Sequence, residues 1–154
     1  MAITTVIPFL IKGWYVACLG AFVGCAYIDW QTRRIPNRIT YPFLVGSLLV
    51  TLLAGQWPSA LWGGLLAGAI LLVPRLIAGP GKAGLGDAKL SALGGVLVGP
   101  QGAIAALLIA FISALLLLLP LLFLKRLRWQ QAVPFGPYLA FGFGLLLISL
   151  LMGK

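Results

Sequence analysis

Only two side chains in this chain of 154 residues are acidic, Asp29 and Asp87, and the sequence contains no glutamate and no histidine. Each lies where a long apolar run meets a basic segment. Two carboxyl groups that lie close together do not readily ionise at the same time, so one holds a proton while the other acts as a base on water. Hydrolysis of a peptide bond by water needs such a shared proton. We therefore expect an aspartic peptidase in which Asp29 and Asp87 form the catalytic dyad.

The composition excludes or disfavours other catalytic and metal-binding arrangements. Without histidine, neither Ser-His-Asp nor Cys-His catalysis is possible. The sequence also has no C-x-x-C pair for structural zinc, so we expect no metal and no cofactor. A Ser91–Lys89 dyad is disfavoured because side chains two residues apart on a helix face different directions. Cys18 and Cys25 are too far apart along one helix to form a disulfide.

The overall composition is that of a membrane protein. The chain is 62% hydrophobic and 8% charged, whereas about a quarter of the residues of soluble globular proteins are charged. Apolar runs of roughly 17 to 25 residues can cross a hydrocarbon core of about 30 Å. We predict an all-α, polytopic membrane protein with about six transmembrane helices, one membrane-embedded domain (1–154) and no soluble domain. The six runs cover 3–28, 40–55, 61–78, 85–98, 102–124 and 133–152.

The fourth run is short for a membrane span, because about 14 residues of helix reach only about 21 Å. Five spans and a half-helix are therefore the alternative. Glycines at small-xxx-small spacing let helices approach closely. With 20 glycines, some matches arise by chance, so they support compact packing and nothing more specific. The three pairs are Gly20/Gly24, Gly64/Gly68 and Gly95/Gly99.

The net charge of +9 has a simpler origin than binding to nucleic acid. Basic residues cluster around the first, third and fifth connections between runs, and the second and fourth connections have none. This alternation follows the positive-inside rule, which places the basic connections in the cytoplasm and both termini outside. We predict a multi-pass protein of the cytoplasmic membrane with its active site facing the cytoplasm, and basic connections suited to anionic lipid head groups. The clusters are Arg33, Arg34 and Arg38; Arg75, Lys82 and Lys89; and Lys125, Arg126 and Arg128.

Both acidic residues are predicted to lie at helix edges. Pro36 disfavours helix at the residue before it, so the first span should end shortly after Asp29. Asp87 follows a glycine-rich turn and opens the fourth run. Alternatively, Asp29 pairs with Arg33 one turn on, and Asp87 caps a helix N-terminus. Both acids share one predicted membrane face, however, and ionisable residues near membrane depth are usually functional. Helix dipoles favour Asp87 as the resting base and Asp29 as the resting acid, whereas Arg33 favours the reverse for Asp29.

A third segment, Pro134-Phe135-Gly136-Pro137, opens the last run. Two prolines around Phe135-Gly136 predict an irregular backbone, which at this depth should be buried against protein or water. The alternative is an ordinary proline-rich helix start. Because this segment lies on the same predicted face as both aspartates, we expect it to wall the site or to dock the substrate.

Three motifs together resemble the type IV prepilin peptidases, the G-x-G-D aspartic proteases of bacterial and archaeal membranes. The motifs are Asp29 with Ile35-Pro36-Asn37 downstream, Gly84-Leu85-Gly86-Asp87-Ala88-Lys89, and Pro134-Phe135-Gly136-Pro137. The resemblance implies cleavage of a short basic leader from pilin-like or pseudopilin precursors at the cytoplasmic membrane face, with Asp29 and Asp87 as the dyad. Larger members add an amino-terminal region with zinc-binding cysteine pairs and methylate the new amino terminus. This chain has no such region, so methyl transfer is not expected. The supporting site residues are Pro36, Asn37, Gly84, Gly86, Lys89, Pro134, Gly136 and Pro137.

Rival functions make different predictions for the two acids. In a small proton-coupled transporter or channel component, Asp29 and Asp87 would relay protons, and such acids belong near the bilayer midplane rather than at helix edges. Presenilin-like proteases share G-x-G-D, but their two aspartates come from adjacent helices, whereas two predicted spans intervene here. A non-catalytic assembly subunit would not need both acids. The sequence does not indicate an oligomeric state.

Overall fold

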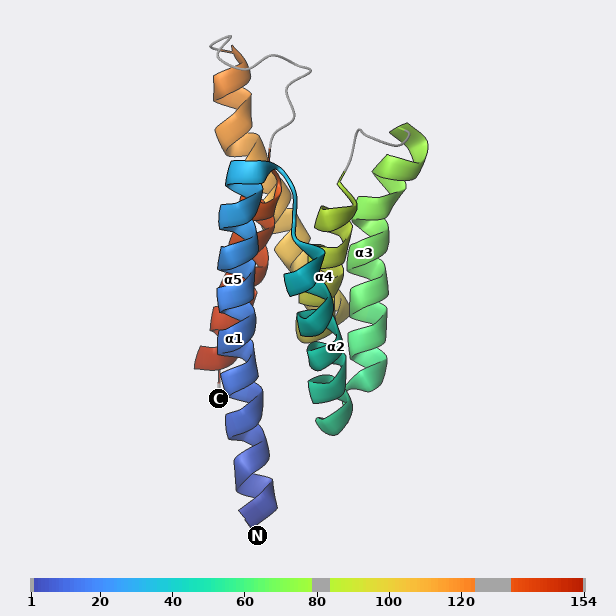
Figure 1. Ribbon diagram of the computed structural model, residues 1–154, viewed down its shortest axis with the longest axis vertical. Coiled ribbons are helices and arrows are strands. Elements are labelled where there is room, and N and C mark those ends of the chain that lie inside the picture. The colour runs from blue at the N-terminus through green and yellow to red at the C-terminus, as the bar shows by residue number, and fades with distance from the viewer. Residues whose placement is uncertain (1, 79–83, 124–133, 154) are drawn as a thin grey trace.

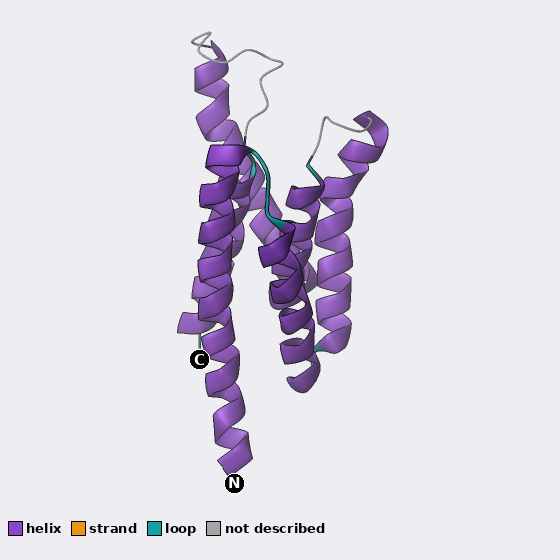
Figure 2. Cartoon of the chain, in the orientation of Figure 1, coloured by secondary structure: helices purple, strands orange, loops and turns teal. Residues whose placement is uncertain are grey.

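The computed structural model describes residues 2–78, 84–123 and 134–153 of the chain. The regular secondary structure of this described part is entirely helical, as Figure 2 shows. This confirms the predicted all-α fold class. The five helices are α1 (Ala2–Thr32), α2 (Asn37–Leu53), α3 (Trp57–Ala78), α4 (Leu85–Phe123) and α5 (Gly136–Met152) (Figure 1).

Helix α4 consists of two helical segments that meet at Gly99. Gly99 has a φ of 72° and a ψ of 179°, a conformation that side chains with a Cβ rarely adopt. Pro100 follows and lacks the N–H group that would continue the hydrogen-bond ladder. The chain turns back at this point, so the second segment of α4 runs antiparallel to the first (Figure 1). The predicted division of this region into two helices is therefore confirmed.

By length and composition alone, two stretches of the described residues could cross a membrane, Phe9–Thr32 and Leu85–Pro120. The second contains the reversal at Gly99 and is therefore two helical segments. Three further apolar helices are shorter, Asn37–Leu53, Trp57–Val73 and Gly136–Met152. The described residues thus provide all six predicted helical runs, with α4 supplying two of them. That all six cross a bilayer remains a prediction.

The ends of the helices gather at two opposite sides of the bundle. Both chain termini lie toward one side, and the helix ends that border the three basic connections lie toward the other (Figure 1). This arrangement is the one that the charge alternation predicts, although it does not show which side faces the cytoplasm. Four of the nine basic residues in these clusters, Lys82, Lys125, Arg126 and Arg128, lie outside the described part of the chain.

Helices α3 and α4 meet through backbone atoms. A Cβ atom on Gly63 would overlap the carbonyl oxygen of Gly95, and a Cβ atom on Gly95 would overlap the carbonyl oxygen of Gly63. Glycine at both positions lets the two helices approach more closely than larger residues would allow. The predicted pairs Gly64/Gly68 and Gly95/Gly99 face this interface, so their role in close packing is confirmed.

The third predicted pair, Gly20/Gly24 on α1, does not mediate helix packing. Among the described residues, none places a heavy atom within 4 Å of a Cβ built at either glycine. The expectation of close packing is therefore wrong for this pair, because the face of α1 that carries it is not the face that packs on its neighbours.

Large apolar side chains cover the outside of the bundle, and small residues fill much of its interior. Leu65, Ile77 and Leu116 are exposed, whereas alanine, glycine and serine line the contacts between α3 and α4. Soluble proteins rarely expose such extended apolar surface. Buried polar groups are satisfied internally, since the Ser91 hydroxyl donates to the Ala67 carbonyl at 2.9 Å. These features fit a membrane protein and give Ser91 a structural role.

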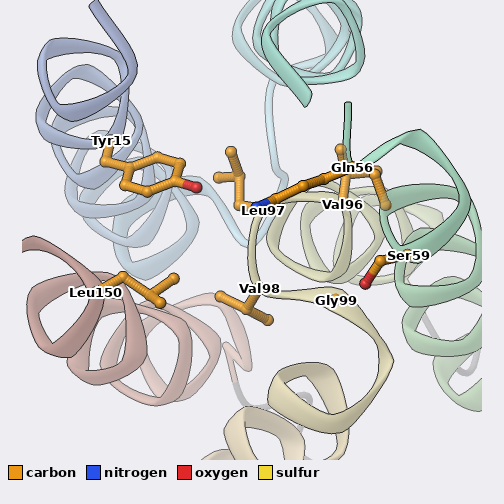
Figure 3. Close-up of a pocket in the computed structure, with 9 residues that line it drawn as sticks. Tyr15, Gln56, Ser59, Val96, Leu97, Val98, Gly99 and Leu150 are labelled. Atoms are coloured by element: carbon orange, nitrogen blue, oxygen red, sulfur yellow. The ribbon is translucent and has the colours of Figure 1, made fainter. Parts of the chain in front are cut away.

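A polar cavity of about 170 Å³ lies at the break in α4, on the side of the bundle that holds the termini. Tyr15, Gln56 and Ser59 line it together with Gly99 (Figure 3). Non-helical backbone at membrane depth is tolerated where it lines a polar cavity or is buried in protein. The cavity therefore explains how the chain can reverse direction at Gly99.

Candidate active site

Asp29 lies in the last turn of α1 and is only 5% exposed. The helix ends at Thr32 because Arg33 adopts a left-handed conformation with a φ of 53°. Arg33 contacts Asp29 through the backbone, where its N–H donates to the Asp29 carbonyl oxygen at 2.8 Å. The predicted end of the first span, between Asp29 and Ile35, is confirmed.

The carboxylate of Asp29 contacts the first residue of α5. The Gly136 N–H donates to Asp29 Oδ2 at 2.8 Å, and this hydrogen bond is buried. Phe135 is the N-cap residue of α5 and has an α-helical backbone conformation, with a φ of −94° and a ψ of −18°, and Pro137 lies in the first turn. At Phe135 the structure therefore matches the alternative of an ordinary proline-rich helix start rather than the predicted irregular backbone. The positive end of the α5 dipole faces Asp29 and favours its ionised form. This opposes the effect of the C-terminus of α1, which favours the neutral form of Asp29. The assignment of Asp29 as the resting acid thus stays a prediction, and the contact with α5 opposes it.

Asp87 is the third residue of α4 and is partly buried. The helix begins at Leu85, so Asp87 lies inside the first turn and is not the N-cap residue of the alternative interpretation. Its carboxylate folds back over the start of the helix, where a Cβ on Gly84 would lie 3.0 Å from Asp87 Oδ2. The glycine before the helix therefore leaves room for this side chain.

The first two motifs contact each other directly. A Cβ on Gly86 would lie 2.8 Å from the Cβ of Ile35, so the first turn of α4 packs against the connection between α1 and α2. Lys89 Nζ donates to Asn37 Oδ1 at 3.1 Å and lies 4.7 Å from the centre of the Tyr41 ring. Lys89 therefore joins the start of α4 to the first turns of α2. Ile35 belongs to the first motif, but its contact with Gly86 was not predicted, and Tyr41 was not among the predicted site residues. A single sequence offers no signal for such contacts between distant residues.

Asp29 and Asp87 line the same cavity, whose volume is about 300 Å³. The two aspartates are 58 residues apart in the chain. The helices that carry them have different main packing partners, α5 for α1 and α3 for the first segment of α4. Basic side chains surround the two carboxylates. The other residues that line the cavity are Arg33, Arg34, Ile35, Asn37, Gly84, Leu85, Gly86 and Lys89.

Four of the eight predicted supporting residues line this cavity, namely Asn37, Gly84, Gly86 and Lys89. Gly136 reaches the site through its hydrogen bond to Asp29. Pro36 precedes α2 as its N-cap residue. Pro137 lines a separate apolar groove between α4 and α5, so the structure does not place it or Pro134 on the cavity with the aspartates.

A model of the type IV leader peptidase family matches residues 15–119. The chain belongs to this family. The matched region runs from α1 into the second segment of α4 and contains both aspartates. No solved structure gives a significant match to the chain.

Curated relatives support the same membership in the type IV leader peptidase family. The chain is 36% identical over 129 residues to a prepilin leader peptidase/N-methyltransferase from Dickeya chrysanthemi, covering 80% of this chain and 46% of that protein. It is 33% identical over 138 residues to one from Burkholderia pseudomallei (strain K96243), covering 82% and 45%. A third, from Aeromonas salmonicida, is 32% identical over 124 residues, covering 77% and 43%. The chain thus spans less than half the length of these relatives.

Proposed function

We propose that this protein is a membrane aspartic endopeptidase that removes the short leader from type IV prepilin-like precursors. The observation that carries the proposal is that the only two acidic residues of the chain, Asp29 and Asp87, line one cavity. Membership in the type IV leader peptidase family supports both the reaction and the class of substrate.

The proposed chemistry needs one protonated and one ionised carboxyl group. The ionised group takes a proton from a water molecule, whose oxygen bonds to the carbon of the scissile carbonyl, while the protonated group gives its proton to the carbonyl oxygen. The tetrahedral intermediate then collapses and the carbon–nitrogen bond breaks. The leaving amine takes up the proton that the initially ionised carboxyl group had accepted from water. A hydroxyl group of the intermediate gives its proton to the other carboxyl group, so the dyad again holds a single proton.

We place the site at the cytoplasmic face of the cytoplasmic membrane, with both termini outside. Asp29 lies in the last turn of α1 and Asp87 in the first turn of α4. These two helix ends lie toward the side of the bundle where the basic connections begin and end (Figure 1). The positive-inside rule favours the cytoplasm for that side. A precursor would then be cut before its mature part leaves the membrane.

The basic residues around the cavity would repel a basic leader unless their charges are balanced. Lys89 contacts two neutral groups, Asn37 and the Tyr41 ring, which orient its ammonium group but leave its charge in place. Arg33 and Arg34 are exposed next to the end of α1, where anionic lipid head groups can neutralise them. The aspartate dyad supplies the negative charge that attracts the leader.

The proposal is tested with the protein reconstituted in vesicles of mixed anionic and zwitterionic lipid. A panel of purified precursors with basic leaders is added, and mass spectrometry locates any cut. We expect one cut that releases the leader. If none of the precursors is cut while the vesicles show proton flux that depends on both aspartates, the transporter interpretation replaces this proposal.

Lys89 provides a further test of how the site is built. Lys89→Met removes the hydrogen bond to Asn37 and the contact with the Tyr41 ring, so we expect the cleavage rate to fall by about 10-fold. Lys89→Arg should keep most of the activity, because a guanidinium can still donate to Asn37 and lie over the ring. Rates for the two variants are compared at equal amounts of folded protein. Equal activity of Lys89→Met and the parent protein would show that these contacts do not support the site.

A further inference from the structure

We infer that Gly136 is a positioning residue whose backbone N–H orients the Asp29 carboxylate for catalysis, rather than a residue that docks the substrate. The inference rests on the proposed function. Its basis is the buried hydrogen bond of 2.8 Å from Gly136 N to Asp29 Oδ2. This bond holds one carboxylate oxygen on α5 and leaves Oδ1 as the oxygen that exchanges a proton during the reaction.

The start of a helix is well suited to this task. The first N–H groups of a helix have no acceptor within the helix, so the N–H of Gly136 is free to donate to another group. A hydrogen bond to a charged acceptor is stronger than one between neutral groups. The backbone therefore holds Asp29 without a side chain that would itself occupy the cavity.

The space beside Asp29 requires glycine at this position. A Cβ on residue 136 would lie 2.8 Å from Asp29 Oδ2 and 2.9 Å from Asp29 Cβ. Distances this short do not occur between real atoms of these kinds, so any larger residue displaces the carboxylate or the start of α5. Glycine is needed at position 136 for its small size and not for its backbone conformation. The glycines with a positive φ in the described residues are Gly55 and Gly99.

A second contact fixes the register of the two helices. Phe22 on α1 stacks on Phe143 on α5, with ring centres 5.6 Å apart. Phe22 precedes Asp29 by seven residues, and Phe143 follows Gly136 by seven residues. The two helices are antiparallel (Figure 1). The Phe22–Phe143 contact therefore lies about 10 Å along the helix axes from the Asp29–Gly136 contact on both helices. Sliding α5 along α1 would break both contacts together, so the buried phenylalanines hold the amide opposite Asp29.

The test uses two changes at position 136, one that removes the N–H group and one that adds a Cβ atom. Cell-free synthesis into lipid nanodiscs can place glycolate at position 136, which replaces the N–H by an ester oxygen and adds no Cβ. Gly136→Ala keeps the N–H and adds the Cβ. Gly20→Ala is the matched control, because Gly20 is also helical and nothing lies within 4 Å of a Cβ there.

For both changes at Gly136 we expect kcat to fall by about 10- to 100-fold with KM within about two-fold of the parent value. The Gly20→Ala control should match the parent protein. A rise in KM at unchanged kcat would show that the residue docks substrate, and full activity of the ester protein would show that the N–H is not needed. Either result overturns the inference.

A spectroscopic measurement tests the same contact without turnover. In the Asp87→Asn background Asp29 is the only aspartate of the chain, so isotope-labelled aspartate marks its carboxyl group alone. The ester at position 136 should shift the infrared carboxyl band of Asp29, and an unchanged band would refute the contact. If the parent protein cuts no precursor but the band shifts, the proposed function fails while the Asp29–Gly136 contact stands.

Discussion

We expect Asp29→Asn and Asp87→Asn each to abolish the proposed leader cleavage while the protein stays in the membrane at the level of the parent. An amide of the same shape neither takes up nor releases a proton under these conditions, and loss of one general acid or base costs about 100- to 10,000-fold in rate. The fold should survive, because the side-chain oxygen of an asparagine at position 29 can still accept the hydrogen bond from Gly136. The measurement is the conversion of a co-expressed precursor, read as a mobility shift and normalised to the amount of enzyme in the membrane.

Gln31→Ala is the control for this experiment, because Gln31 is exposed and lies two residues beyond Asp29. It should cleave the precursor at the rate of the parent. Cleavage that survives either aspartate change would exclude the dyad mechanism. Loss of the protein from the membrane would instead point to a structural role, which purified variants in nanodiscs would separate from a catalytic one.

Gly95→Ala should destabilise the protein strongly, although it adds a single methyl group. The added Cβ would overlap the Gly63 carbonyl, so α3 and α4 must move apart along their whole contact. Overpacking of a close interface costs about 1 to 3 kcal/mol. The first segment of α4 also carries Asp87, so the shift should lower the cleavage rate as well.

Thermal unfolding in detergent, followed by tryptophan fluorescence, measures this effect. Gly20→Ala and Gly24→Ala are the matched controls, since both add the same methyl group to a helix with open space beside it. Alanine favours helix over glycine by about 1 kcal/mol, so the controls should be neutral or more stable. A Gly95→Ala protein that unfolds at the temperature of these controls would show that the α3–α4 contact is looser than described.

Local sequence signals predict much of the fold and of the site. Hydrophobic runs, prolines and glycines locate the helices, and Pro36 correctly indicates that α1 ends just beyond Asp29. The two acids are predicted to meet because they are the only ones and because the charge alternation places them on one face. The structure agrees in placing both on one cavity.

Contacts between distant residues could not be predicted in the same way. The spacing of Gly20 and Gly24 resembles that of Gly64 and Gly68, yet only the second pair packs against a neighbour, because spacing does not say which face of a helix is covered. The hydrogen bond from Gly136 to Asp29 joins residues 107 apart. It depends on the register of α1 against α5, which a single sequence does not encode in any local pattern.

The reversal at Gly99 makes the first segment of α4 a lever. About twelve residues separate Gly99 from Asp87, and they form a rigid arm of about 18 Å. A tilt of about 5° at the pivot would carry the Asp87 carboxylate by about 1.5 Å along the arc of such an arm. Any change at the Gly99 cavity that tilts this segment would therefore move Asp87 relative to Asp29. Because this segment packs on α3 through the backbone at Gly63 and Gly95, α3 would have to move with it.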